Sequence, residues 1–173
     1  DKKNYKKAVY LSSQAKDDAT LFIHNEVGYN FRLSRLHSSV GLAQIEKISK
    51  VLKKKRQIHN FYKNKIDKIE GLNILEQPDY CKSNYWLNIL TINEKKYNLS
   101  KNEIIQKFKK KGIETRSVWY PNHLQKPFTN FQRYKLDNSK NLYEKCLCLP
   151  SSFNINKNEQ VKIINYLKSK FKK

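Results

Sequence analysis

A helical pattern of apolar residues over residues 34–71 is the feature that most constrains how this chain can fold. The apolar positions lie three or four residues apart on both sides of a basic cluster at 53–56, and they are Leu42, Ile45, Ile48, Leu52, Ile58, Phe61 or Tyr62, Ile66 and Ile69. Ser34 is a candidate N-cap, and Gly71 supplies a stop. A helix or bent pair of helices of this length is long for a small domain. We therefore expect residues 34–71 to link two lobes.

The residues that follow this pattern alternate between strand-like and helix-like segments. Capping residues mark two of the helices, which begin at Ser100 with Glu103 and at Asn156 with Glu159. The final helix is expected to turn Val161, Ile164, Leu167 and Phe171 inward. The expected order is a strand at 83–92, a helix from 100 to 112, a strand at 113–120, a helix at 138–145, a strand at 147–150 and a last helix after 156. This order predicts a small α/β layer over residues 72–173, a sheet with helices packed on it. Before residue 34 we expect a short helix over 2–15 and a brief strand over 21–23.

The chain is strongly basic, with 36 Lys and Arg against 15 Asp and Glu and a formal net charge of +21. Such a charge admits a nucleic-acid-binding domain, because basic side chains neutralise phosphates. However, nearly all of these residues are Lys, whereas base recognition favours the planar fork of Arg. The Lys are also spread along the whole chain. We therefore expect solvated surface charge and no nucleic-acid partner, with nucleic-acid binding as the weaker alternative.

Several other protein classes are excluded by what the sequence lacks. No apolar run approaches the roughly 20 residues that span a bilayer, and the first residues lack the apolar core of a signal peptide. The three Cys form no CxxC pair, so neither a metal site nor a disulfide scaffold is expected. The four Gly build neither a GxGxxG motif nor a P-loop. These features predict a cytoplasmic protein with reduced thiols. Because the chain contains no Met and begins at Asp1, we also expect it to be the C-terminal part of a longer protein.

Two segments carry more functional residue types than packing requires. Residues 28–34 place Asn30, Arg32 and Ser34 before the start of a helix, which suits a phosphate site but also an ordinary capped helix entrance with a surface Arg. Residues 115–128 gather polar and aromatic side chains at a strand end and in its loop, where ligand-binding residues tend to lie. These side chains are Arg116, Trp119, Tyr120, Asn122 and His123. The four His do not assemble into a recognisable catalytic constellation.

Six motifs follow one another along the chain: QAKDD at 14–18, HNEVGYNFRL at 24–33, GLAQIE at 41–46, GIETR at 112–116, NHLQKP at 122–127 and LCLP at 147–150. This series resembles, in order, the C-terminal half of DegT-type nucleotide-sugar aminotransferases. The segment around 118–119 and the segment 122–127 look most like the branch that makes bacillosamine or legionaminic acid precursors. The resemblance covers nearly the whole chain, and the ordered series is more specific than any single motif.

The resemblance implies the fold-type I architecture of pyridoxal phosphate (PLP) enzymes. Residues 1–33 would be the tail of the large PLP domain, 34–71 the linking helix and 72–173 the small C-terminal α/β domain. The family assigns Asn30 to the PLP phosphate of the partner subunit and Arg32 to the phosphates of the nucleotide sugar. His123, with Tyr120 or Asn122 nearby, would line the sugar pocket, and Arg116 would also bind the substrate.

The implied activity is transfer of an amino group, from glutamate, to a nucleotide-linked 4-keto-6-deoxysugar for surface glycans. No Lys of this chain lies in the motif that holds the family's Schiff-base Lys, which belongs to the N-terminal half, so we expect the chain to be inactive alone. Its expected partner is a second subunit or the complementary N-terminal half. At 35–39 the sequence RLHSS replaces the family's usual Asn, apolar, polar, Ala, Ala. A non-catalytic remnant, or a split-gene half that acts only in dimerisation, is the alternative.

Overall fold

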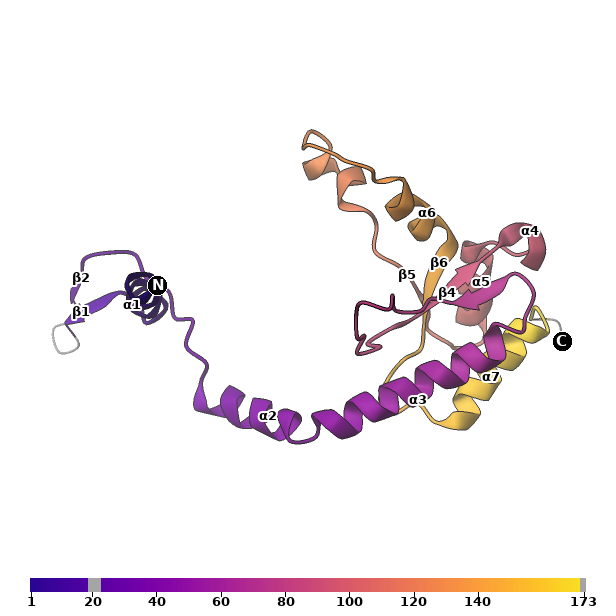
Figure 1. The fold of residues 1–173 in the computed structure, drawn as a ribbon, viewed down its shortest axis with the longest axis horizontal. Helices are drawn as coiled ribbons and strands as arrows, with labels where there is room; N and C mark the ends of the chain where they lie inside the picture. The colour runs from indigo at the N-terminus through magenta and orange to yellow at the C-terminus, as the bar shows by residue number, and fades with distance from the viewer. Residues whose placement is uncertain (19–22, 172–173) are drawn as a thin grey trace. The chain divides into compact units, whose positions relative to one another are not determined.

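The computed structural model describes residues 1–18 and 23–171, and the chain divides into two units, residues 1–48 and 49–173 (Figure 1). The first unit contains α1 (Lys2–Ser12), β1 (Lys16–Asp18), β2 (Ile23–His24) and α2 (Arg35–Ile45). The expected helix over 2–15 is thus confirmed. Of the brief strand expected over 21–23, Ile23 opens β2, whereas residues 21 and 22 lie outside the described residues.

The helical pattern over 34–71 forms two successive helices, α2 and α3, rather than a single one. Ser34 caps α2 as expected, and its Oγ accepts a hydrogen bond from the His37 backbone N–H at 3.3 Å. The second helix, α3 (Ile48–Ile66), ends five residues before Gly71, which is earlier than the sequence suggested. Gly71 occupies the turn that follows, where its φ of +82° and the close approach of the Tyr97 backbone N exclude a side chain.

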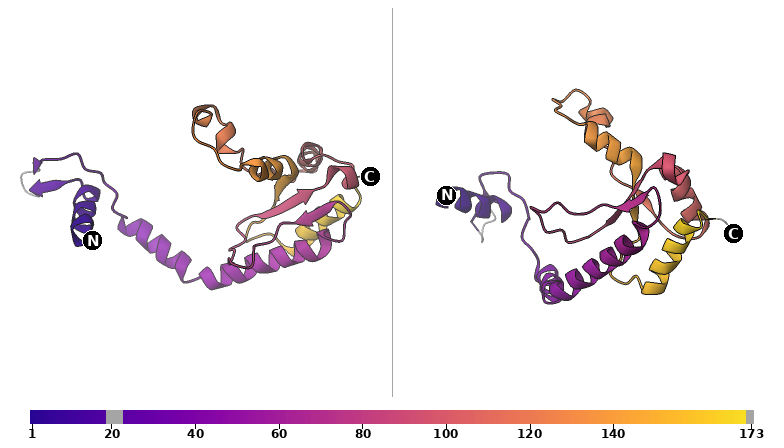
Figure 2. Two further views of the ribbon diagram at one scale, coloured as in Figure 1. Left: turned by 45° about the horizontal axis from the view of Figure 1, so that its top comes forward. Right: turned by 45° about the vertical axis from the view of Figure 1, so that its right-hand side comes forward.

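The second unit is built on a four-stranded antiparallel sheet with the strand order β3-β4-β6-β5. Figure 2 shows α3 and α7 running beside this sheet. The remaining elements of the unit are β3 (Leu72–Ile74), β4 (Asn88–Ile92), α4 (Glu94–Tyr97), α5 (Lys101–Lys110), β5 (Arg116–Ser117), η1 (Asn122–Leu124), η2 (Lys126–Phe128), α6 (Asp137–Lys145), β6 (Cys146–Leu149) and α7 (Lys157–Lys168).

One hydrophobic core holds the second unit together. Helix α3 contributes Ile58, Tyr62 and Ile66, and the strands contribute alternating apolar residues. Both predicted capping boxes are present at the starts of α5 and α7. The buried side chains from the strands, the other helices and the loop before α7 are Leu72, Ile74, Leu90, Ile92, Tyr97, Ile104, Phe108, Leu147, Leu149, Ile155, Ile163, Ile164 and Leu167.

The structure corrects several expected details. The strand expected over 83–92 is regular only from residue 88, because Tyr85 takes a left-handed conformation with φ +49°. The strand expected over 113–120 shrinks to β5, and β3 was not foreseen. In α7 Val161 is exposed, whereas Gln160 and Ile163 are buried. No helix of the described residues is both long and apolar enough to cross a bilayer.

Candidate phosphate-binding and sugar-binding residues

The segment that carries Asn30 is fixed to the end of α1 by backbone hydrogen bonds. Tyr29 N donates to Leu11 O at 2.8 Å, and Phe31 N donates to Ser12 O at 3.0 Å. A Cβ on Gly28 would lie 2.3 Å from the backbone N of Ala15, so only glycine permits this approach. Gly28 thereby allows the following residues to run alongside the helix end.

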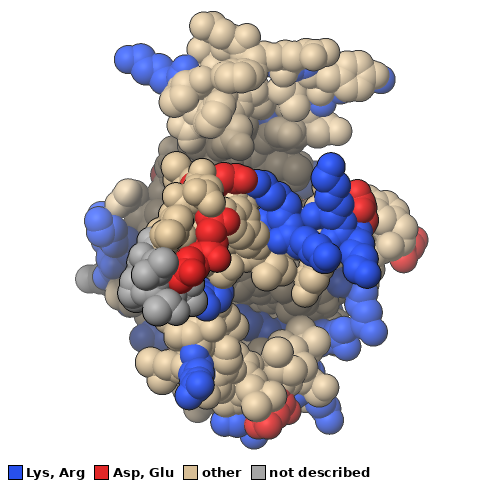
Figure 3. All heavy atoms as spheres, turned by 90° about the vertical axis from the view of Figure 1, so that its left-hand side faces the viewer, with Lys and Arg blue, Asp and Glu red and all other residues tan. Residues whose placement is uncertain are grey.

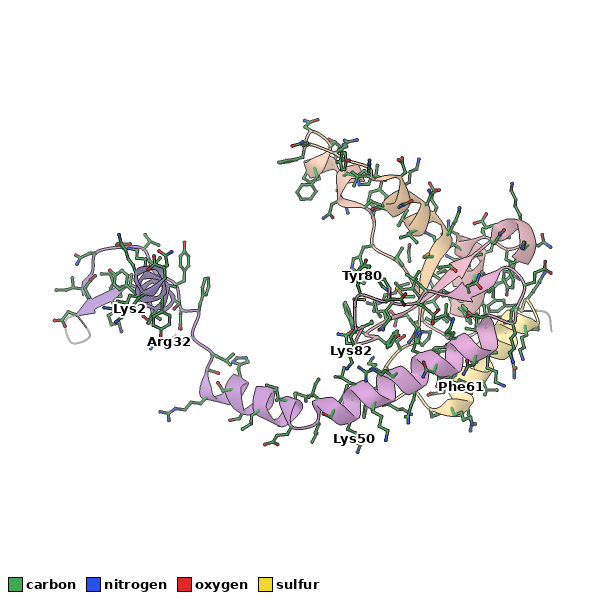
Figure 4. All side chains as sticks on the ribbon, viewed as in Figure 1. Lys2, Arg32, Lys50, Phe61, Tyr80 and Lys82 are labelled. Atoms are coloured by element: carbon green, nitrogen blue, oxygen red, sulfur yellow. The ribbon has the colours of Figure 1, made fainter. Side chains whose placement is uncertain are left out.

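Asn30 and Arg32 offer free hydrogen-bond donors. The rings of Tyr29 and Phe31 stack with their centroids 5.0 Å apart, which places them on one side of the segment. Because successive side chains of extended backbone alternate, Asn30 points to the opposite side. Both Asn30 and Arg32 are exposed, and among the described residues neither side chain makes a hydrogen bond. Arg32 is labelled in Figure 4. An amide and a guanidinium in this state suit phosphate oxygens.

Tyr120, Asn122 and His123 lie together, as the sequence predicted. They line one cavity of about 560 Å³ in the second unit. The short 3₁₀ helices η1 and η2 form this part of the chain, and aromatic side chains complete the wall. The other lining residues are Trp119, Pro121, Phe128, Phe131, Gln132, Leu136 and Ser139. The cavity combines an apolar body with a few polar groups, which is typical of small-molecule sites.

The structure does not bring Arg116 into this group. Its guanidinium forms an ion pair with Glu114 at 2.7 Å, and this carboxylate raises the pKa of Arg116. Arg116 lines a different cavity, of about 610 Å³, together with Cys148 and Ser151. Arg116 therefore lies outside the cavity that Tyr120, Asn122 and His123 line. The reason is that β5 is only two residues long, so the chain leaves the sheet before Tyr120.

Lys101 does not line the cavity, but it contacts residues that pack against the cavity wall. Lys101 was not identified from the sequence. Its Nζ donates to Ser117 Oγ at 3.0 Å and to Tyr143 O, and it lies 4.0 Å from the centroid of the Tyr143 ring. The Tyr143 ring in turn meets Tyr120 edge-on, with the centroids 5.1 Å apart. Burial lowers the pKa of Lys101. Lys101 thus ties α5 to β5 and α6, and nothing in the sequence distinguishes it from the surface Lys.

Neither metal binding nor reactive thiols are indicated by the described residues. Among them, no group of three His, Cys, Asp or Glu lies close enough to hold a metal ion. Cys146 and Cys148 are free and buried, and burial raises the pKa of both thiols. Lys and Arg side chains are spread over the face drawn in Figure 3, with fewer Asp and Glu among them. This spread is what the sequence predicts for solvated surface charge.

A model of the DegT/DnrJ/EryC1/StrS aminotransferase family matches residues 1–168. The chain belongs to this family. Its similarity to EpsN of Bacillus subtilis (strain 168) is 34% identity over 96% of this chain and 43% of EpsN. Its similarity to GDP-perosamine synthase of Escherichia coli O157:H7 is 28% identity over 93% of this chain and 42% of that protein. The resemblance noted in the motifs is confirmed, and members of this family depend on PLP.

Solved structures support the same fold. PseC of Helicobacter pylori, an aminotransferase of pseudoaminic acid biosynthesis, superimposes with a TM-score of 0.81 at 21% identity, over 99% of this chain and 47% of PseC. The aminotransferase TlmJ of Streptoalloteichus hindustanus gives a TM-score of 0.83 at 17% identity, over 98% of this chain and 45% of TlmJ. The chain thus has the fold of a C-terminal portion of fold-type I aminotransferases, and it spans less than half the length of these relatives.

Proposed function

We propose that this chain is the C-terminal portion of a PLP-dependent aminotransferase. The whole protein would convert a nucleotide-linked 4-keto-6-deoxysugar into its 4-amino sugar for surface glycans, with glutamate as the amino donor. Two relatives with 28% identity support this substrate class by their names: a UDP-4-amino-4,6-dideoxy-N-acetyl-β-L-altrosamine transaminase of Campylobacter jejuni and a dTDP-4-amino-4,6-dideoxy-D-glucose transaminase of Shigella dysenteriae. The segments around 118–127 favour the branch of bacillosamine and legionaminic acid precursors.

The observation that carries the proposal is the presentation of Asn30 and Arg32. Gly28 lets the segment pack against Ala15, and the exposed amide and guanidinium then stand free of protein partners among the described residues. Such donors fit the phosphate of PLP and the phosphates of a nucleotide sugar. We assign Asn30 to the PLP phosphate of a partner subunit and Arg32 to the phosphates of the nucleotide.

The cavity of Tyr120, Asn122 and His123 would hold the sugar. Its polar groups can hydrogen-bond sugar hydroxyls, while its aromatic wall covers the apolar face of the ring. Arg116 is the weakest of the proposed substrate residues, because Glu114 already pairs with its guanidinium. Bound PLP supplies the electron sink for amino transfer. The Lys that holds PLP would lie in the part of the relatives that this chain does not span, so the chain alone should be inactive.

The first unit supports association with a partner. Among its described residues only Ala15 is buried, and α2 buries none. Its exposed apolar side chains include Leu33, Leu36, Val40, Leu42 and Ile45. Surfaces of this kind mark protein interfaces. The partner would be the complementary N-terminal portion and a second subunit, with 1–33 as the tail of the large domain and 34–71 as the link to the small domain of 72–173.

The test uses the chain joined to an N-terminal segment that brings it to the length of its relatives. The joined protein should retain PLP through gel filtration, seen as visible absorbance, and should aminate a nucleotide-linked 4-keto-6-deoxysugar. Asn30→Ala should lower PLP retention, and Arg32→Ala should raise KM for the nucleotide sugar more than it lowers kcat. Asn64→Ala, at an exposed position of α3, is the matched control and should change neither quantity.

Unchanged PLP retention in the Asn30→Ala protein would overturn the role given to Asn30. A joined protein that folds but neither retains PLP nor turns over any sugar would overturn the enzymatic proposal. In that case a joined protein that still forms dimers would favour the alternative of a remnant that acts only in dimerisation.

A further inference from the structure

The two Trp of this chain lie side by side on the surface of the second unit. The ring centroids of Trp86 and Trp119 are 5.9 Å apart, and the ring planes are inclined by 42°. Each residue is 64% exposed. Trp is highly buried on average, and paired exposed aromatic rings mark binding sites more often than isolated ones. No element of the sugar cavity requires Trp86, so the pair calls for a further explanation.

Trp86 is held in its exposed position by the residues around it. Tyr85, with its left-handed backbone, stacks its ring on the buried His59 at 3.9 Å. Trp86 N donates to Asn84 Oδ1 at 2.9 Å, and Lys55 Nζ donates to Trp86 O at 3.3 Å. Strained backbone persists only where its surroundings fix it, and such residues cluster at functional sites. These bonds fix the backbone of Trp86, so its segment loses less freedom on ligand binding than a flexible loop would.

Trp119 connects the pair to the cavity of Tyr120, Asn122 and His123, because it lines that cavity. A ligand that places polar groups in the cavity can therefore reach the Trp pair with a neighbouring part. A flat aromatic group suits such a pair of rings, because aromatic faces stack with an additional gain beyond the area that they bury. The substrate class proposed above contains such a part, the purine or pyrimidine base.

We propose that Trp86 and Trp119 form a stacking platform for the base of the nucleotide sugar. The inference rests on the proposed function, since that function supplies the ligand. Stacking on aromatic faces tolerates any base, because every base has a π-face. One pair of rings beside one open cavity fits a single nucleotide. Single-stranded nucleic acid is bound instead by aromatic rings repeated along a basic groove.

The test exploits the fact that these are the only two Trp, so tryptophan emission of the 173-residue chain reports on the platform alone. UDP and GDP should both quench the emission saturably, whereas ribose 5-phosphate, which lacks the base, should not. Calorimetric titration of Trp86→Ala and Trp119→Ala should show nucleotide affinity reduced by about five- to a hundredfold. The Phe variants should retain most of it. Tyr80→Ala removes a ring that is 91% exposed in the same unit and serves as the control, with unchanged affinity.

Two results would overturn the platform. The first is that the Trp86→Ala and Trp119→Ala variants bind UDP and GDP as tightly as the unchanged chain does. Binding of ribose 5-phosphate as tightly as UDP and GDP would count in the same way. The second is binding of oligouridylate that tightens with length and falls steeply with salt, which would assign the rings to single-stranded nucleic acid. Because these titrations need neither PLP nor the N-terminal segment, their failure is separate from that of the proposed function. A joined protein that retains PLP and aminates sugars, with no base stacking here, would refute the platform alone.

Discussion

At the scale of single residues, a buried polar network holds the loop that follows β6. His59 is 2% exposed, and its Nδ1 lies 3.0 Å from Asn88 Oδ1. Asn88 donates from both N and Nδ2 to Ser151 Oγ at 2.9 Å, and Ser151 Oγ donates to Leu149 O. These bonds join α3 to β4 and to the segment after β6. Burial is the largest influence on His59 and lowers its pKa.

This network predicts a loss of stability in acid. Above the ordinary histidine pKa of 6.5 neither the folded nor the unfolded state is protonated at His59, and the full stability is present. Below 6.5 the unfolded state takes up a proton first, because the folded pKa is lower, so the free energy of unfolding falls as the pH falls. For one proton the slope reaches about 1.4 kcal/mol per pH unit at most.

Urea unfolding at a series of pH values checks this prediction by comparing the chain with its His59→Gln variant. All other titrating groups are common to both proteins, so the difference between their pH slopes belongs to His59. The variant should show the shallower slope between pH 6.5 and 5. Equal slopes would mean that His59 does not couple folding to pH.

Some of the site could be predicted from residues close in sequence. Tyr120, Asn122 and His123 are near neighbours in one loop, so their shared cavity follows from local structure. Gly28 belongs to a motif that the sequence analysis identified. The structure shows why this position needs glycine, because a Cβ there would collide with the backbone of Ala15. The partnership of Trp86 with Trp119 joins two loops that lie far apart in the sequence. No sequence pattern could show that pairing.

At the scale of elements, capping and burial decide how much each helix contributes to stability. Ser34 and Ser100 make the same bond, since each Oγ accepts the N–H of the third helical residue at 3.3 Å. Helix α5 buries Ile104 and Phe108 in the core, whereas α2 buries no residue. The loss of a cap matters to global unfolding only if the helix unfolds together with the core.

The matched pair of variants Ser100→Ala and Ser34→Ala tests this difference. Ser100→Ala should lower the free energy of unfolding by about 1 kcal/mol, a typical cost of removing an N-cap. Ser34→Ala should leave the unfolding of the core nearly unchanged. The measurement is the midpoint of urea unfolding, monitored with a probe that reports on the second unit. Equal losses in the two variants would show that α2 unfolds with the core after all.

The same contrast explains which elements the sequence predicted well. The helices α5 and α7 each carry an amphipathic pattern and a capping box, and the starts of α5, α6 and α7 lie within one or two residues of expectation. The short strands were harder to predict. β5 has two residues and is defined only by its pairing with β6, as Arg116 with Cys148 and Ser117 with Leu147. Such a strand depends on a partner distant in sequence, and local periodicity cannot supply it.

At the scale of the whole molecule, the two units differ in how their backbone hydrogen bonds are protected. The second unit encloses the core, with Leu90 and Leu147 fully buried in adjacent strands. The helix α2 has 11 residues and no buried side chain. Isolated helices shorter than about 12–15 residues are marginal in water, because their stability comes from packing. α2 therefore needs a surface that covers its apolar side chains.

Amide hydrogen exchange of the 173-residue chain should show this difference directly. The amides of β4 and β6 should exchange only through global unfolding, whereas those of α2 should exchange nearly as in a free peptide. In the protein joined to its N-terminal segment, α2 should gain protection while β4 and β6 change little, because the new surface covers Leu36, Val40 and Ile45. Protection of α2 equal to that of β4 in the chain alone would contradict this prediction. It would mean that α2 is stable without a covering surface and that the first unit needs no partner to hold this helix.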